Sequence, residues 1–244
     1  MSLNDLYEKL TNPKLTRFCI MTELLIFIPG LIIAIIIAHF FGPPAYIPLL
    51  PYLLRNPGSI KWGRYSLMQN WISDLGSFRF TPAPFILDFM LMSAGCLMIS
   101  VFFYLYEKLL PTPSKFSSID GDTKGARIFG KITTIGLVFG AIGAFGAGLF
   151  SEDRSYFGLH GVFSIIVFGG FAIGGLCAAL AIVLKDTFIP KIFGIIILCS
   201  PVATLLFVLN PFNNLYILEW LMMFCIFAWI IPIALIILKE AKEE

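Results

Sequence analysis

The residues of this chain that could carry out chemistry are a few acids and two histidines beside long apolar blocks. The segment NWISDLGS contains Asp74, and the segment FSEDRSYFGLH contains Asp153 and His160. An imidazole can take up and release a proton near neutral pH, and a neighbouring carboxylate can orient it. We therefore predict Asp74, His160 and Asp153 as catalytic residues, with His160 acting as a general base on water.

Other polar residues lie at a similar depth below the same end of the apolar blocks. Asp88 and Glu219 are on the order of 6 to 9 Å inside their blocks, at about 1.5 Å of helix per residue. Ionisable groups at such depths are costly, and they usually face a cavity or one another. As an alternative, these two acids pair with Arg79 or Arg154. We predict a polar site, open to one side of a membrane, whose substrate-binding residues are Asn70, Ser73, Asp88 and Glu219.

A metal-assisted hydrolase is a variant of this prediction, because two histidines with carboxylates can hold a catalytic zinc ion. The sequence contains no H-E-x-x-H or comparable spacing, so the metal and any other cofactor are unknown. A nucleophilic role for Ser73 is disfavoured, because no G-x-S-x-G turn surrounds it. The candidate metal ligands are His39, His160, Asp74 and Glu152.

The elements that must position these residues are membrane-spanning helices. The chain is 58% hydrophobic and 13% charged, with a mean hydropathy of +0.90, whereas soluble domains carry about 25% charged residues. The apolar blocks are roughly 20 residues or longer, as a helix needs to cross a bilayer. The sequence predicts one all-α domain over 1–244, a bundle of six spans joined partly by an outer loop at 42–81. The predicted spans are 18–41, 82–109, 128–150, 156–184, 191–210 and 215–238.

The distribution of basic residues predicts the orientation of this bundle. Six spans place both termini on one side of the membrane. Of the 17 lysines and arginines, twelve fall on that side, and such a bias marks the cytoplasmic face. We therefore predict a multi-pass protein of the cell membrane with cytoplasmic N- and C-termini. The net charge of +2 gives no reason to expect nucleic acid as a partner. The five basic residues on the opposite side are Arg55, Lys61, Arg64, Arg79 and Arg154.

The outer loop carries the pattern of a short amphipathic helix. Leu67, Met68, Trp71, Ile72 and Leu75 recur on one helical face. The pattern predicts an interfacial helix on the outer face of the bundle, ended at the glycine that follows. Its acid, Asp74, would lie in the last turn, where the helix dipole disfavours an anion, so a partner is expected.

Glycines and prolines predict how the spans pack and bend. Glycines recur every four residues in the third and fourth spans and would let these two helices approach closely inside the bundle. A proline at the start of the second span follows Thr81, which we expect to cap that helix. Prolines within the first, fifth and sixth spans should bend them. Glu23 in the first span is expected to pair with Lys131 or with another cation at the inner edge of the membrane. The residues concerned are Gly136, Gly140, Gly170, Gly174, Ala178, Pro29, Pro201 and Pro232.

The segments NWISDLGS, FSEDRSYFGLH and LEW, with Trp229 beyond the last, resemble the membrane family described as domain of unknown function 998. More distantly, the ISD-x-G run and the later histidine are similar to the damage-regulated autophagy modulator superfamily. The resemblance implies the six-helix plan and a shared outer site at the matching positions. The wider superfamily includes relatives linked to lipid remodelling of membrane anchors. The matching positions are Ser73, Asp74, Gly76, Asp153, His160 and Glu219.

These observations favour a protein that binds or modifies a membrane lipid at an outward-facing polar site. If it is an enzyme, we expect a lipid-directed hydrolase or transferase, with membrane lipids as partners. Two alternatives stay open. A non-enzymatic scaffold or subunit of a membrane complex, or a homo-oligomer, would use the same charges as structural pairs. A transporter of a small solute or proton would need a polar path, which the apolar inner halves of the spans disfavour.

Overall fold

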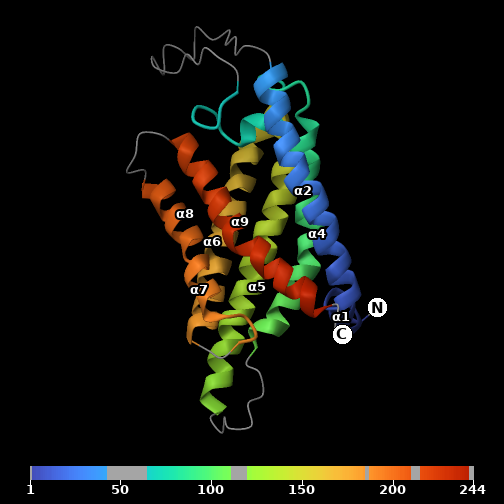
Figure 1. Cartoon of the computed structure of the whole chain (residues 1–244), viewed down its shortest axis with the longest axis vertical. Helices are drawn as coiled ribbons and strands as arrows, with labels where there is room; N and C mark the ends of the chain where they lie inside the picture. Colours follow the sequence, from blue (N-terminus) through green and yellow to red (C-terminus); the bar gives the residue numbers. More distant parts are fainter. Residues whose placement is uncertain (1, 43–64, 111–119, 185–186, 210–214, 242–244) are drawn as a thin grey trace.

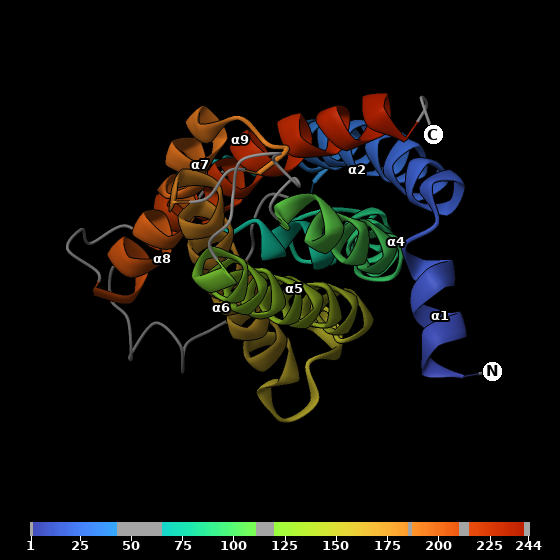
Figure 2. The same cartoon turned by 90° about the horizontal axis from the view of Figure 1, so that it is seen from below.

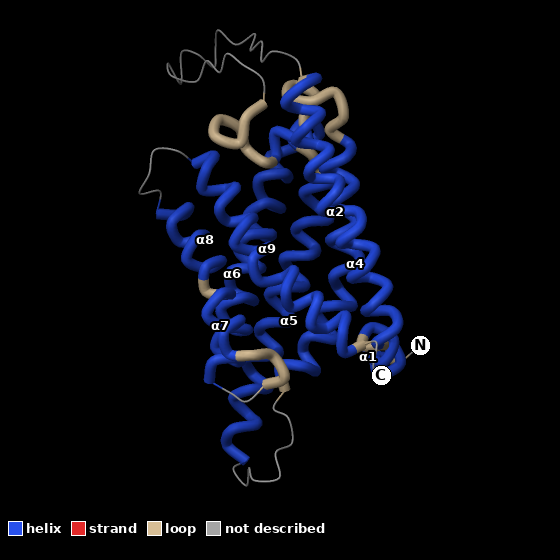
Figure 3. Tube along the Cα trace, in the orientation of Figure 1, coloured by secondary structure: helices blue, strands red, loops and turns tan. Residues whose placement is uncertain are grey.

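All regular structure in the described part of the chain is helical (Figures 1 and 3). The computed structural model describes residues 2–42, 65–110, 120–184, 187–209 and 215–241. The six predicted spans are confirmed as helical segments long and apolar enough to cross a membrane. In chain order the helices are α1 (Leu3–Leu10), α2 (Pro13–Phe41), η1 (Ser73–Gly76), α4 (Phe85–Leu109), α5 (Asp120–Leu149), η2 (Glu152–Arg154), η3 (Tyr156–Gly158), α6 (Leu159–Leu184), α7 (Lys191–Ile197), α8 (Cys199–Leu209) and α9 (Leu215–Glu240).

Local chemistry shifts two of the predicted helix starts. Helix α2 begins at Pro13, earlier than expected, because the side chain of Asn12 accepts hydrogen bonds from the N–H groups of Lys14 and Leu15. Helix α4 begins only at Phe85. The Thr81 hydroxyl does accept an N–H, that of Ala83 at 3.2 Å, but this contact closes a turn that precedes the helix.

The fifth span is broken into α7 and α8 at Leu198. Pro201 has no N–H to donate to the carbonyl of Ile197, and its ring crowds that carbonyl, so the chain cannot continue as one regular helix. This is the disruption predicted from the sequence. Pro29 and Pro232 differ, because each lies inside a helix that runs on without interruption.

Both chain ends lie at one end of the bundle, which we call the terminal end; residues 65–81 lie at the other, the covered end (Figure 1). Seen along the bundle, α4 lies between α2 and α5, and α7 and α8 pack on the α6 side (Figure 2). The outside is rich in exposed apolar side chains such as Leu25, Phe41 and Ile165. Soluble proteins rarely expose so much apolar surface, so this exterior suits a lipid environment.

Helices α5 and α6 form the most extensive contact of the bundle, and glycine makes it possible. A Cβ placed on Gly136 would lie 2.7 Å from the backbone nitrogen of Gly174. A Cβ on Gly170 would lie 2.5 Å from the backbone nitrogen of Gly140. Only hydrogen side chains permit such an approach. The predicted use of these glycines inside the bundle is confirmed.

Residues 65–81, which we call the cover segment, fold over the covered end against α2 and α4. The amphipathic helix expected here is not confirmed, because only Ser73–Gly76 is helical, as one 3₁₀ turn. Met68 is exposed, whereas Asn70 and Asp74 are buried. The polar side chains turn inward because they bond the backbone locally, in competition with a regular helix. The first part of the predicted outer loop, 43–64, lies outside the described residues.

We expect Gly136→Ala to destabilise the protein and Gly169→Ala to leave it unchanged or slightly more stable. Both changes gain up to about 1 kcal/mol of helix propensity. Only the first forces a methyl group into the α5–α6 contact, which costs about 1 to 3 kcal/mol, since nothing lies within 4 Å of a Cβ on Gly169. The melting temperatures of the two variants in detergent check this. Equal shifts would contradict the role assigned to the glycines.

Candidate functional site

Carboxylates from two neighbouring parts of the bundle hold the cover segment in place. Glu219, on α9, accepts a 2.7 Å hydrogen bond from the backbone N–H of Ile72. Asp153, on η2, accepts from the Ser77 hydroxyl at 2.8 Å and from the backbone N–H of Phe78 at 2.6 Å. The acceptors are carboxyl oxygens, and hydrogen bonds to them are stronger when the carboxyl group is ionised. The two predicted site residues therefore both act as anchors of the backbone.

Asp74 is 2% exposed and organises the inside of the cover segment. Its Oδ2 accepts hydrogen bonds from the Asn70 side-chain amide at 2.9 Å and from the Trp71 backbone N–H at 3.0 Å. The carbonyl of Asn70 in turn accepts the indole N–H of Trp220 at 3.1 Å. The partners of Asp74 described so far, Asn70 and Trp71, belong to the cover segment itself.

A second acid lies against Asp74. The Glu152 carboxyl shares a hydrogen bond with the Asp74 carboxylate, and Arg79 is the nearby cation. Partial burial, together with the negative charge of Asp74, raises the pKa of Glu152 from 4.5 to about 7. The two acids can therefore share one proton near neutral pH, which joins η2 to the cover segment.

Asp88, predicted as a substrate-binding residue, is paired with Arg154. Their side chains meet at 2.5 Å, and Arg154 also donates to the Ser151 hydroxyl at 3.1 Å. Gly76 packs directly on this pair, since a Cβ there would lie 3.2 Å from an oxygen of Asp88. The contact ties α4, η2 and the cover segment together, as the structural alternative predicted.

One ring nitrogen of His160, Nε2, has no hydrogen-bond partner among the described residues. Its Nδ1 lies 2.9 Å from the carbonyl oxygen of Phe150 and 3.3 Å from that of Ala147. Carbonyl oxygens only accept, so Nδ1 carries the proton and Nε2 is left as an acceptor. Nε2 is buried and has no hydrogen-bond partner among the described residues. The expected orientation of His160 by Asp74 or Asp153 is not observed, because main-chain carbonyls hold the ring instead.

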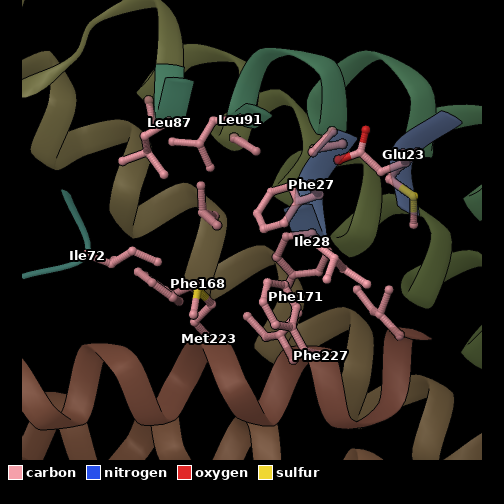
Figure 4. Close-up of a pocket in the computed structure, with 18 of the residues that line it drawn as sticks. Glu23, Phe27, Ile28, Ile72, Leu87, Leu91, Phe168, Phe171, Met223 and Phe227 are labelled. Atoms are coloured by element: carbon pink, nitrogen blue, oxygen red, sulfur yellow. The ribbon is translucent and has the colours of Figure 1, made fainter. Parts of the chain in front are cut away.

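Below the cover segment an internal cavity of about 170 Å³ runs between α2, α4, α5, α6 and α9 (Figure 4). Its lining is almost entirely apolar, with Phe27, Leu91, Phe168 and Met223 among the labelled side chains. The polar lining residues are Glu23, Ser73, His160, Ser164 and Glu219. The sequence predicted a polar site open to one side of the membrane and not this apolar cavity, because apolar residues that line a cavity have the same pattern in a sequence as residues of a packed core.

Within the described part of the chain, His39 and Glu23 do not have the partners that the sequence predicted. The Nδ1 of His39 donates to the Tyr65 carbonyl at 2.9 Å, and its ring contacts Phe40. Glu23 has no ion-pair partner among the described residues, although we expected Lys131. Within the described ranges no three side chains of the metal-binding types stand together as a possible metal site. The metal-assisted variant gains no support from the geometry.

Comparison of the chain with protein-family models, with curated proteins and with solved structures gives no significant match. The family resemblance of the three short segments therefore stays a prediction, and function must be argued from the site itself.

The shared proton of Glu152 predicts a pH-dependent stability. Because the pKa of Glu152 is about 7 in the folded protein and 4.5 ordinarily, the folded state holds a proton between these values that the unfolded state releases. Raising the pH across this interval should lower the free energy of unfolding. We expect the melting temperature to fall between pH 5 and about 7, and Glu152→Gln to make that fall smaller. The exposed control Glu8→Gln should retain it; a fall unchanged in Glu152→Gln would refute the assignment.

The anchoring role of Asp153 can be measured by amide hydrogen exchange. Asp153→Ala removes both acceptors of Ser77 and Phe78, and a hydrogen bond to a charged group contributes about 1.5 to 3 kcal/mol. We expect exchange of the Phe78 amide to accelerate by about tenfold or more. Asp153→Asn keeps one acceptor oxygen and should give a smaller increase. Exchange unaffected by Asp153→Ala would show that other contacts hold the segment.

Proposed function

We propose that this protein binds a single-chain amphiphile of the membrane in its internal cavity. The polar end of that molecule would lie at the covered end, beside Ser73, His160 and Glu219, and its apolar chain would extend between the helices. The observation that carries the proposal is an apolar cavity lined in part by His160, whose Nε2 is buried and has no hydrogen-bond partner among the described residues.

The size of the cavity limits its ligand. Sites for drug-sized molecules measure about 300 to 1,000 Å³, and an engineered cavity of about 150 Å³ takes up benzene. At about 170 Å³ this cavity suits one slender chain and excludes the two chains of a typical phospholipid. The apolar lining favours hydrocarbon by removing it from water or from polar headgroups.

The polar end of the ligand should carry a hydrogen-bond donor. The His160 ring presents Nε2 as an acceptor because the carbonyls of Phe150 and Ala147 fix the proton on Nδ1. A buried acceptor without a donor is unfavourable. A ligand hydroxyl would satisfy it, so a long-chain alcohol or a lipid with a free hydroxyl fits best.

A route into the cavity from the bilayer lies between α2 and α9. Leu24 and Ile28 of α2, and Ile230 and Ile231 of α9, line the cavity and are also partly exposed. The edge-to-face ring pair Phe27–Phe227, with centroids 5.3 Å apart, spans this seam. In our proposal the protein lies in the cell membrane with cytoplasmic termini, as the lysine and arginine bias indicates, and the ligand enters sideways from the lipid.

Chemistry on the bound molecule is a second candidate function. The unprotonated Nε2 of His160 could remove a proton from a ligand hydroxyl or a water, as a lipid-directed hydrolase or transferase requires. The neighbouring carboxylates of Asp74 and Asp153 are engaged by the cover segment. Their part in such a reaction would be to hold Ser73 over the cavity mouth.

Native mass spectrometry of the protein released from phosphatidylcholine nanodiscs, titrated with decanol, tests the binding function. We expect one bound decanol per protein. Ala144→Leu, which fills the cavity wall from α5, should abolish binding. His160→Ala should weaken it by roughly 2- to 12-fold, the value of one hydrogen bond. The control His39→Ala should bind like the wild type. Decanol binding that survives Ala144→Leu would place the ligand elsewhere and overturn the proposal.

A further inference from the structure

Glu23 is a buried acid without an ion-pair partner among the described residues. Its side chain comes from α2, lines the cavity and is 7% exposed. Neither carboxyl oxygen has a hydrogen-bond partner among the described residues. The nearby Ser93 hydroxyl donates instead to the Met90 carbonyl at 2.8 Å. A buried carboxyl group is costly unless a donor or a cation meets it.

The described residues supply no lysine or arginine to the lining of this cavity. None of its lining residues in the described part of the chain is a lysine or an arginine, whereas two, Glu23 and Glu219, are acids. Glu219 already accepts the backbone N–H of Ile72. If Glu23 is charged, its compensating positive charge comes from outside the described lysines and arginines, and a ligand in the cavity that Glu23 lines is one source.

Glu23 and His160 stand at different depths of the same cavity. His160 lies beside the cover segment, and Figure 4 shows Glu23 at the far side of the cavity from Ile72, a cover-segment residue. Ser93, which faces Glu23, lies nearly two turns further along α4 than the lining residue Leu87, roughly 9 Å at about 1.5 Å per residue. Apolar side chains line the space between the two acceptors.

We infer that the cavity recognises an amphiphile with a polar donor at each end, a hydroxyl at the His160 end and an ammonium group at the Glu23 end. This inference rests on the proposed binding function and adds the class of ligand. A plain hydrocarbon tail would leave the Glu23 carboxyl unpaired. A protonated amine supplies both the opposite charge and the hydrogen bonds that this carboxyl lacks.

Three decyl probes separate the contributions of the two ends. Decanol carries only the hydroxyl, decylamine carries only the ammonium, and aminodecanol, with its amine on the terminal carbon, carries both. Their dissociation constants are measured by native mass spectrometry of the protein in phosphatidylcholine nanodiscs, with empty nanodiscs as the control for partitioning. N-acetylated aminodecanol serves as the neutral counterpart of the amine.

We expect aminodecanol to bind about tenfold or more tightly than decanol and than its acetylated form, because a buried charge gains a partner. Glu23→Gln should remove this preference for the amine. His160→Ala should weaken aminodecanol more than decylamine. The exposed control Glu8→Gln should match the wild type.

The possible outcomes test the inference about Glu23 separately from the proposed binding function. If the wild type binds decanol but gains nothing from the amine, the inference about Glu23 is overturned and the proposed function stands. This comparison uses the wild type alone, so it holds even if Glu23→Gln does not fold. If no probe binds the wild type, both the proposed function and the inference fail. An amine preference that persists in Glu23→Gln would also overturn the assignment of the ammonium group to Glu23.

Discussion

The arrangement of the covered end depends on one requirement, that the backbone N–H groups of an irregular segment find acceptors away from water. Between Trp71 and Phe78 the chain forms only one 3₁₀ turn, so the N–H groups that flank this turn need acceptors other than helical carbonyls. Side-chain carboxylates of Asp74, Asp153 and Glu219 supply the acceptors. Because two of these acids come from other elements, satisfying the backbone also fixes the cover segment over the mouth of the cavity.

This use of acids explains why so many like charges gather at one end of the bundle. Anions packed together repel one another, and the structure offsets the repulsion in two ways. Arg154 neutralises Asp88 directly, and Glu152 can hold a proton beside Asp74 because its pKa is raised to about 7. Most of the acids that the sequence marks as candidates for catalysis are therefore committed to structure. His160 is set apart from them, since its Nε2 is left free by the contacts of Nδ1.

The large features of the fold could be predicted from the sequence because they follow from simple periodicities and lengths. The apolar blocks predicted six spans, and the glycine spacing predicted the close α5–α6 contact around Gly136 and Gly170. The gathering of Asp74, Glu152 and Glu219 near one another also followed from their common depth. The predicted amphipathic helix is not confirmed, because side-chain acceptors such as Asp74 compete with a regular helix. The hydrophobic periodicity of the sequence does not reveal this competition.

The cavity could not be predicted, and the reason lies in how α5 divides its small residues between two faces. On one face Gly136, Gly140 and Gly143 bring α6 into contact with the backbone. On another face Ala141, Ala144 and Ala147 line the cavity. Small residues on the first face therefore allow close helix packing, whereas small residues on the second face leave a cavity. The positions of the neighbouring helices determine which of the two results.

Side chains do not fill the space beside these alanines, and no described lysine or arginine lies in its lining. Larger residues from α2 and α9, among them Phe27 and Phe227, form its opposite wall and meet at a seam where neighbouring lining residues are partly exposed. A bundle built only for stability would close such a space, since a cavity lowers stability by removing packing contacts. It would also leave no carboxyl such as that of Glu23 unpaired within it. In our proposal a bound molecule completes the shape and polarity of this space and meets its two acceptors, Nε2 of His160 and the carboxyl group of Glu23.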